Sequence, residues 1–139
     1  MEDFWDFFSW VRFLVFKDED AGDQFAGEAN QGYPPTSPAN EIKAWAFVKN
    51  LCLENLQKFD QTLEEDNKLL EDPNLSFIDR NCITVRAFEK KVFHYTIKCA
   101  DTFMTLFSMS RKDANLEVNK MKDFSKEFSF FKKTMIILK

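Results

Sequence analysis

Apolar residues recur at intervals of three and four along most of this chain, which is the spacing of one face of an α-helix. The pattern predicts three long amphipathic helices, over about residues 38–71, 77–108 and 114–138. Ser37 followed by proline is a favourable start for the first of them, because serine caps a helix and proline suits its first turn. Asp72 and Pro73 then end that helix, since proline disfavours helical geometry in the residue before it.

Each predicted helix carries one apolar face, which we expect to form the core. On the first long helix this face contains Trp45, Val48, Cys52, Leu56, Phe59, Leu63 and Leu70. On the second it contains Val85, Phe88, Val92, Tyr95, Cys99, Phe103 and Leu106. On the third it contains Met121, Phe124, Phe128, Phe131, Met135 and Leu138. Ser76 with Asp79 predicts a cap for the second helix, and Asp113 a cap for the third.

The first sixteen residues, MEDFWDFFSWVRFLVF, predict an aromatic-rich helix within residues 1–17 that is apolar almost all round. Such a helix is buried on more than one side or lies against another hydrophobic surface. Three interpretations are open: it completes the core, it docks on a partner or a second copy, or it lies at a membrane interface. Its acidic residues Glu2, Asp3 and Asp6 argue against the last, because interfacial helices meet anionic lipid with basic residues.

Residues 18–37 predict a flexible acidic linker, since they hold all three glycines of the chain and two adjacent prolines, with no apolar periodicity. Residues 38–139 then form the helical core. Seventeen phenylalanines with so few glycines favour long helices with aromatic packing over a many-stranded sandwich. The predicted fold is therefore a single all-α domain, an antiparallel bundle of three long helices plus the aromatic-rich N-terminal helix.

Cysteine usage and the N-terminus indicate a reducing, cytoplasmic setting. The three cysteines, Cys52, Cys82 and Cys99, lie apart in apolar stretches, which predicts buried free thiols. No basic n-region precedes the apolar start, so a signal peptide is not expected. No stretch of 18 uncharged apolar residues exists, so no membrane-spanning helix is expected. Lysine outnumbers arginine fifteen to four, a composition that fits a viral, parasite or bacterial source.

The net charge of −4 is unevenly divided. Residues 1–76 carry sixteen acidic and six basic side chains, whereas residues 77–139 carry seven acidic and thirteen basic ones. The second predicted helix carries a basic stripe that a phosphate backbone could contact. Its members are Arg86, Lys90, Lys91, His94 and Lys98. Nucleic-acid binding through this stripe is therefore the main alternative function, although solvated helix faces also carry such charges.

No catalytic, cofactor or metal motif stands out. His94 is the only histidine, and its neighbours one helical turn away are Lys90 and Lys98 rather than a nucleophile or carboxylate. The run from Glu64 to Asp66 is interpreted as a solvated charged face, since zinc needs several convergent ligands. The glycines lie in an acidic stretch, which would repel phosphate. We therefore expect no enzyme activity and no cofactor.

The surplus of apolar surface leads to the expected function, a non-enzymatic helical module for protein–protein interaction or assembly. The kinds of protein expected are an adaptor, a complex subunit or a viral or pathogen-type modulator. A protein partner or a homodimer would cover the exposed aromatic side chains. The residues expected to make this contact are Phe4, Trp5, Phe8, Trp10, Phe16 and Phe130. Nucleic-acid binding is the alternative, and membrane-interface association through the N-terminal helix is a lesser one.

Overall fold

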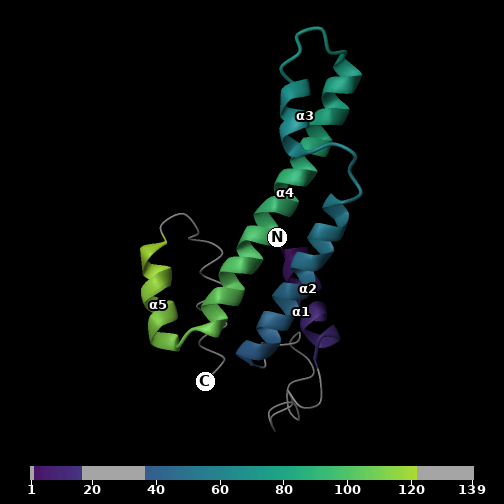
Figure 1. Ribbon diagram of the computed structural model, residues 1–139. Helices are drawn as coiled ribbons and strands as arrows, with labels where there is room; N and C mark the ends of the chain where they lie inside the picture. The colour runs from purple at the N-terminus through teal and green to yellow at the C-terminus, as the bar shows by residue number, and fades with distance from the viewer. Residues whose placement is uncertain (1, 17–36, 122–139) are drawn as a thin grey trace. The chain divides into compact units, whose positions relative to one another are not determined.

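The computed structural model describes residues 2–16 and 37–121, and these residues contain five helices and no strand (Figure 1). The helices are α1 (Glu2–Leu14), α2 (Pro38–Leu56), α3 (Leu63–Leu69), α4 (Phe77–Ser108) and α5 (Arg111–Lys120). The all-α class is therefore confirmed, while the antiparallel arrangement of a bundle stays a prediction. None of the described helices combines the length and the apolar character needed to cross a membrane.

The chain divides into two compact units. The first unit comprises residues 1–47 and 100–139, and the second comprises residues 48–99. The division falls within α2 and within α4, so each of these helices contributes one part to each unit. The predicted linker lies outside the described residues except for Ser37, so the predicted segments 1–17, 18–37 and 38–139 stay a prediction.

The first long helix of the prediction is two helices, because the chain leaves helical geometry after Leu56 and starts again at Leu63. A capping box causes the restart. The Thr62 hydroxyl accepts a hydrogen bond from the Glu65 amide at 3.2 Å, and the Glu65 carboxylate accepts one from the Thr62 amide at 2.7 Å. Threonine followed three residues later by glutamate is a sequence signal for a helix start, and here it overrides the continuous apolar spacing.

Two predicted helix starts are confirmed by their hydrogen bonds. The Ser37 hydroxyl accepts from the Asn40 amide at 3.0 Å at the start of α2. The Ser76 hydroxyl accepts from the Asp79 amide at 3.1 Å at the start of α4. Each hydroxyl thus satisfies a backbone donor that the first turn of a helix leaves without an intrahelical partner.

The start of the last helix differs from the prediction. Ser110, rather than Asp113, is its N-cap, and the Ser110 hydroxyl accepts from the Asp113 amide at 3.2 Å. Helix α5 is described as far as Lys120. The rest of the predicted helix over 114–138 lies outside the described residues, and so does Phe130.

An aromatic stack forms the core of the first unit. Trp45 of α2 is almost fully buried, with its ring centroid 4.3 Å from that of Phe8 in α1 and 4.7 Å from that of Phe103 in α4. Further apolar side chains of this unit are also buried. They are Val11, Ala44, Ala100, Leu106, Phe107, Ala114 and Val118. The N-terminal helix therefore contributes part of its apolar surface to the core, as the first of the three interpretations expected.

A buried ion pair joins α1 to α2 within this unit. Arg12 donates two hydrogen bonds to the Glu41 carboxylate, at 2.6 and 2.8 Å, and both side chains are almost fully inaccessible to solvent. The Asn40 side-chain amide donates to the Arg12 carbonyl at 3.3 Å. Burial raises the pKa of Glu41, and the hydrogen bonds and charge of Arg12 offset part of that rise.

The cysteines differ from the prediction at one position. Cys52 and Cys99 are buried free thiols, as expected, but Cys82 is exposed on α4. Burial raises the pKa of the Cys52 thiol, which lowers its reactivity.

Candidate functional site

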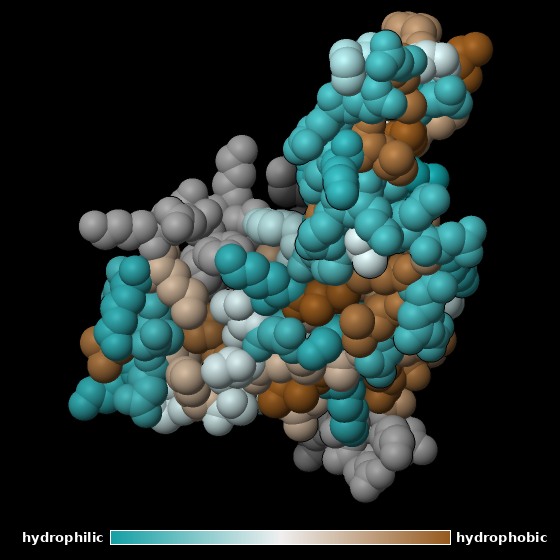
Figure 2. All heavy atoms as spheres, turned by 45° about the horizontal axis from the view of Figure 1, so that its top comes forward, coloured by the Kyte–Doolittle hydropathy of each residue, from teal (hydrophilic) through white to brown (hydrophobic). Residues whose placement is uncertain are grey.

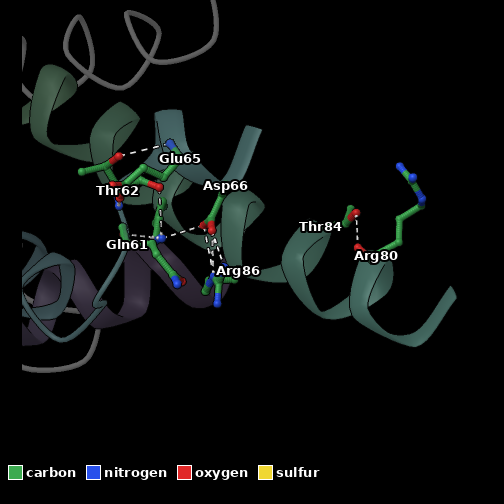
Figure 3. A network of polar contacts seen from close by, with 8 residues as sticks. Gln61, Thr62, Glu65, Asp66, Arg80, Thr84 and Arg86 are labelled. Atoms are coloured by element: carbon green, nitrogen blue, oxygen red, sulfur yellow. Dashed lines mark hydrogen bonds and ion pairs between the residues drawn. The ribbon is translucent and has the colours of Figure 1, made fainter. Parts of the chain in front are cut away.

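A buried carboxylate organises the second unit. Asp66, on the short helix α3, is fully inaccessible to solvent and lies against α4 (Figure 3). The Arg86 guanidinium donates to it through Nε, at 3.0 and 3.1 Å from the two carboxylate oxygens, and through Nη2. This is a two-nitrogen contact between planar groups, the geometry that makes arginine–carboxylate pairs strong and directional.

Lys90 completes the same network from one helical turn further along α4. Its Nζ lies 2.6 Å from Asp66 Oδ2 and 2.6 Å from the Gln61 carbonyl oxygen, with the Thr62 carbonyl at 3.5 Å. The ammonium group also lies 4.9 Å from the centroid of the Phe59 ring. The three protons of a buried ammonium are thus met by three oxygens, and the aromatic face adds a cation–π contact.

These contacts favour the ionised forms of Asp66 and Arg86. The hydrogen bonds from Arg86 hold the pKa of Asp66 below its ordinary value, with burial opposing them and Lys90 adding to them. The same hydrogen bonds raise the pKa of Arg86. The network is therefore one carboxylate shared by two cations, and it fixes α3 on α4.

The basic stripe predicted as an anion or nucleic-acid contact is divided by this network. Arg86 is half-buried and Lys90 is buried, and both donate to Asp66, whereas Lys91, His94 and Lys98 are exposed. Two of the five basic side chains are consequently committed to an internal ion pair. The sequence interpretation of Asp66 as part of a solvated charged run is wrong, because its carboxylate is the acceptor for both cations.

The side of α4 opposite Lys90 is apolar and exposed, which reverses part of the predicted core face. Cys99, Phe103 and Leu106 are buried as expected. Four residues expected to be buried with them are exposed instead: Val85, Phe88, Val92 and Tyr95. In their place Ile83 and Ala87 are buried, on the side of the helix that carries Arg86 and Lys90. Hydrophobic side chains also reach the surface among hydrophilic ones in the space-filling view (Figure 2).

The side chains predicted to contact a partner from the N-terminal helix are in different environments. Trp10 is 53% exposed, Phe16 is half-buried and Phe8 belongs to the core. The side chains of Phe4 and Trp5 lie outside the description, as does Phe130. Trp10 can therefore meet a partner, whereas Phe8 cannot do so without disrupting the aromatic stack on Trp45.

Among residues 2–16 and 37–121, no group of three or more histidine, cysteine or acidic side chains is placed to hold a metal ion. Instead of such a cluster, the described part of the chain presents exposed apolar side chains along α4.

Comparison with protein families matches residues 4–93 to the family described as "Rubisco LSMT substrate-binding". Curated relatives are actin-histidine N-methyltransferases. The Xenopus tropicalis protein is 33% identical over 79 residues, which is 57% of this chain and 14% of that protein. The Danio rerio protein is 35% identical over 65 residues, which is 47% of this chain and 11% of that protein. The Homo sapiens protein is 32% identical over 66 residues, which is 48% of this chain and 11% of that protein. The matched region thus spans about one seventh or less of these relatives. No solved structure matches the chain.

These matches overturn two predictions made from the sequence. The chain is not described correctly as a non-enzymatic adaptor or a viral or pathogen-type module, because its family is a methyltransferase substrate-binding family and its curated relatives are enzymes. The absence of a recognisable nucleophile, metal site or phosphate loop in the sequence does not argue against membership of such a family. A substrate-binding domain is recognised by its surface rather than by a catalytic motif.

Proposed function

Because the chain belongs to the Rubisco LSMT substrate-binding family, we propose that it binds a protein substrate on behalf of a protein N-methyltransferase. The matched residues 4–93 carry this proposal, since they include α1, α2, α3 and the first half of α4. The names of the relatives make actin the substrate to test first, and histidine N-methylation the reaction that binding would serve.

The surface chemistry supports a protein ligand. Large hydrophobic side chains exposed on α4 and α1 suit burial against another protein, because aromatic and aliphatic anchors supply most of the energy of such contacts. The buried Asp66 network favours the same role, since a helix already held in place loses little backbone conformational entropy on binding. A protein partner also agrees with the expectation from the sequence, although the partner is now a substrate. Self-association has no support beyond the exposed aromatic residues.

Binding to purified monomeric actin tests the proposal directly. The full chain would be immobilised and actin applied in solution, with serum albumin at equal concentration as the control for non-specific apolar contact. We expect saturable binding with a dissociation constant of about 1–100 µM, which is the range of a modest protein interface. Absence of saturable binding up to the top of that range would overturn the proposal.

A competition experiment connects binding to the reaction. Excess chain added to the Xenopus tropicalis actin-histidine N-methyltransferase and actin should slow methylation, because the chain would occupy the surface of actin that the enzyme's matching region uses. Raising the actin concentration should restore the rate. A chain that binds actin without affecting methylation would show that it contacts a different surface.

A further inference from the structure

The exposed side of α4 has the dimensions and chemistry of a docking surface for one helix. The outer face of α4 is defined here as Phe77, Ile78, Val85, Phe88 and Val92, all of which are exposed. Resting on the function proposed above, we propose that the protein substrate docks an amphipathic helix with acidic residues along one edge onto this face.

The outer face runs along the helix with one polar interruption. Phe77, Val85, Phe88 and Val92 follow one another at helical spacing, with Asn81 at the one position between the first two. Phe77 is 79% exposed and Phe88 is 67% exposed, so two aromatic rings stand in solvent about three turns apart. From the first to the last of these residues the face is about 23 Å long, enough for four turns of a partner helix.

The opposite side of α4 is fixed in place. Arg86 and Lys90 hold Asp66 of α3 on that side, and Ile83 and Ala87 are buried there. A rotation of α4 that buried the outer face would therefore break a fully buried ion pair, which is strongly unfavourable. The outer face is consequently a stable feature of the second unit rather than a side that the unit can turn inward.

The charges beside the outer face indicate the kind of partner. Arg80 and Lys91 each follow an exposed phenylalanine by three residues, so they lie along one edge of the face. Arg80 is half-buried, and its guanidinium donates to the Leu70 and Asp72 carbonyls at 2.8 and 2.7 Å; these acceptors are neutral, so they do not cancel its positive charge. Glu89 is the acidic side chain on the other edge. A partner helix with carboxylates facing Arg80 and Lys91 gains complementary charge there.

Other segments of the chain match this partner less well. Residues 18–36 are acidic but have no apolar periodicity, so they lack the apolar face of an amphipathic helix. Residues 122–139 carry five lysines against two acidic residues, so they would bring like charge to the edge with Arg80 and Lys91. Helix α1 offers exposed Trp10, which provides a second apolar surface, but the exposed acidic residue near it is Asp6. An acidic partner would avoid that surface, which makes Trp10 a matched control for Phe88.

Two labelled synthetic peptides of about 18 residues, five helical turns, test the proposal. Both carry leucine along one face, and they differ only in having glutamate or lysine along one edge. Binding to the full chain is followed by fluorescence anisotropy at low salt. We expect the glutamate peptide to bind about threefold or more tightly than the lysine peptide, with the preference reduced by salt.

Single substitutions then locate the contact. Phe88→Ala should weaken the glutamate peptide at least about tenfold, as expected for an aromatic anchor, whereas Trp10→Ala should leave it within about twofold. Lys91→Glu should remove or reverse the preference between the two peptides. All three side chains are exposed, so these variants should fold normally, and their circular dichroism spectra check this.

Several results would overturn the inference. Equal loss with Trp10→Ala and Phe88→Ala would mean general apolar adhesion, and an unchanged preference in Lys91→Glu would mean that the basic edge takes no part. The same variants in the binding experiment of the preceding section separate the two proposals. If the wild-type chain and the Phe88→Ala variant bind actin equally well, the outer face is not the docking surface, and the proposed function stands. If the wild-type chain does not bind that substrate, both fall together.

Discussion

Replacing Asp66 by alanine should lower the free energy of unfolding by about 3–5 kcal/mol, because it removes one partner of a buried ion pair. The carboxylate is fully buried, and the Lys90 side chain is only 1% exposed. Without Asp66 the ammonium group keeps carbonyl acceptors from Gln61 and Thr62 but no counter-charge. Arg86 contributes less to the loss, since its side chain is 33% exposed and can turn toward water.

Urea unfolding followed by far-ultraviolet circular dichroism measures this loss. The control is Glu117→Ala, which breaks the exposed pair with Lys120, where the side chains are 39% and 71% exposed. That change should cost about 0.5 kcal/mol or less, as exposed ion pairs do. The double variant Asp66→Ala/Lys90→Met should recover much of the stability, because it leaves no buried charge. A loss below about 1 kcal/mol for Asp66→Ala, or a double variant no more stable than the single one, would refute the argument.

The same pair predicts a dependence on pH. The pKa of Asp66 lies below its ordinary value of 3.8 in the folded chain, mainly because of the hydrogen bonds from Arg86. Its stabilisation is therefore present above the unfolded value and lost as the pH falls through the lower folded value. The stability difference between the wild type and Asp66→Ala should be constant above about pH 5 and shrink below about pH 4. A difference that shrinks on raising the pH instead would contradict the assigned direction.

Three further predictions concern the cores, the helix starts and the thiols. Trp45→Ala should cost about 3–5 kcal/mol in thermal or urea unfolding, because it opens a cavity between two aromatic rings, and Trp45→Phe should cost clearly less. Thr62→Ala should lower stability by about 1 kcal/mol in urea unfolding through loss of the capping box, and Thr62→Ser should largely preserve it. In the native chain a thiol reagent should modify Cys82 quickly and reach Cys52 and Cys99 only after urea is added, and rapid reaction of all three would contradict their burial.

The apolar spacing alone was enough to predict the all-α class and the approximate positions of most helices. Local signals placed helix starts accurately where a serine preceded the helix, as at Ser37 and Ser76. The sequence also contains a signal for a new helix after the break at Leu56, since Thr62 and Glu65 have the spacing of a capping box. The apolar spacing alone does not reveal this break, because it continues at intervals of three and four through the residues between α2 and α3.

The network of Asp66, Arg86 and Lys90 could not be predicted from the sequence. The spacing marks Arg86 and Lys90 as candidate residues, but it does not indicate their contact with Asp66, because that carboxylate lies at least twenty residues away in the sequence. Nothing in a run of three acidic residues indicates which of them will be buried. The role of the chain was missed for a similar reason: a substrate-binding surface needs no catalytic motif, so only likeness to known proteins could supply it.

By itself, then, the sequence determined which segments are helical, because hydrogen bonding and side-chain spacing within a helix are local. Only the tertiary structure decided which side of α4 is buried. That helix has apolar residues on both sides, and the periodicity favoured the side with Val85 and Phe88. Asp66 reverses this choice, because its carboxylate neutralises Lys90 and Arg86 and makes burial of the more polar side favourable. The more apolar side is left exposed, and it is there that we place the docking surface.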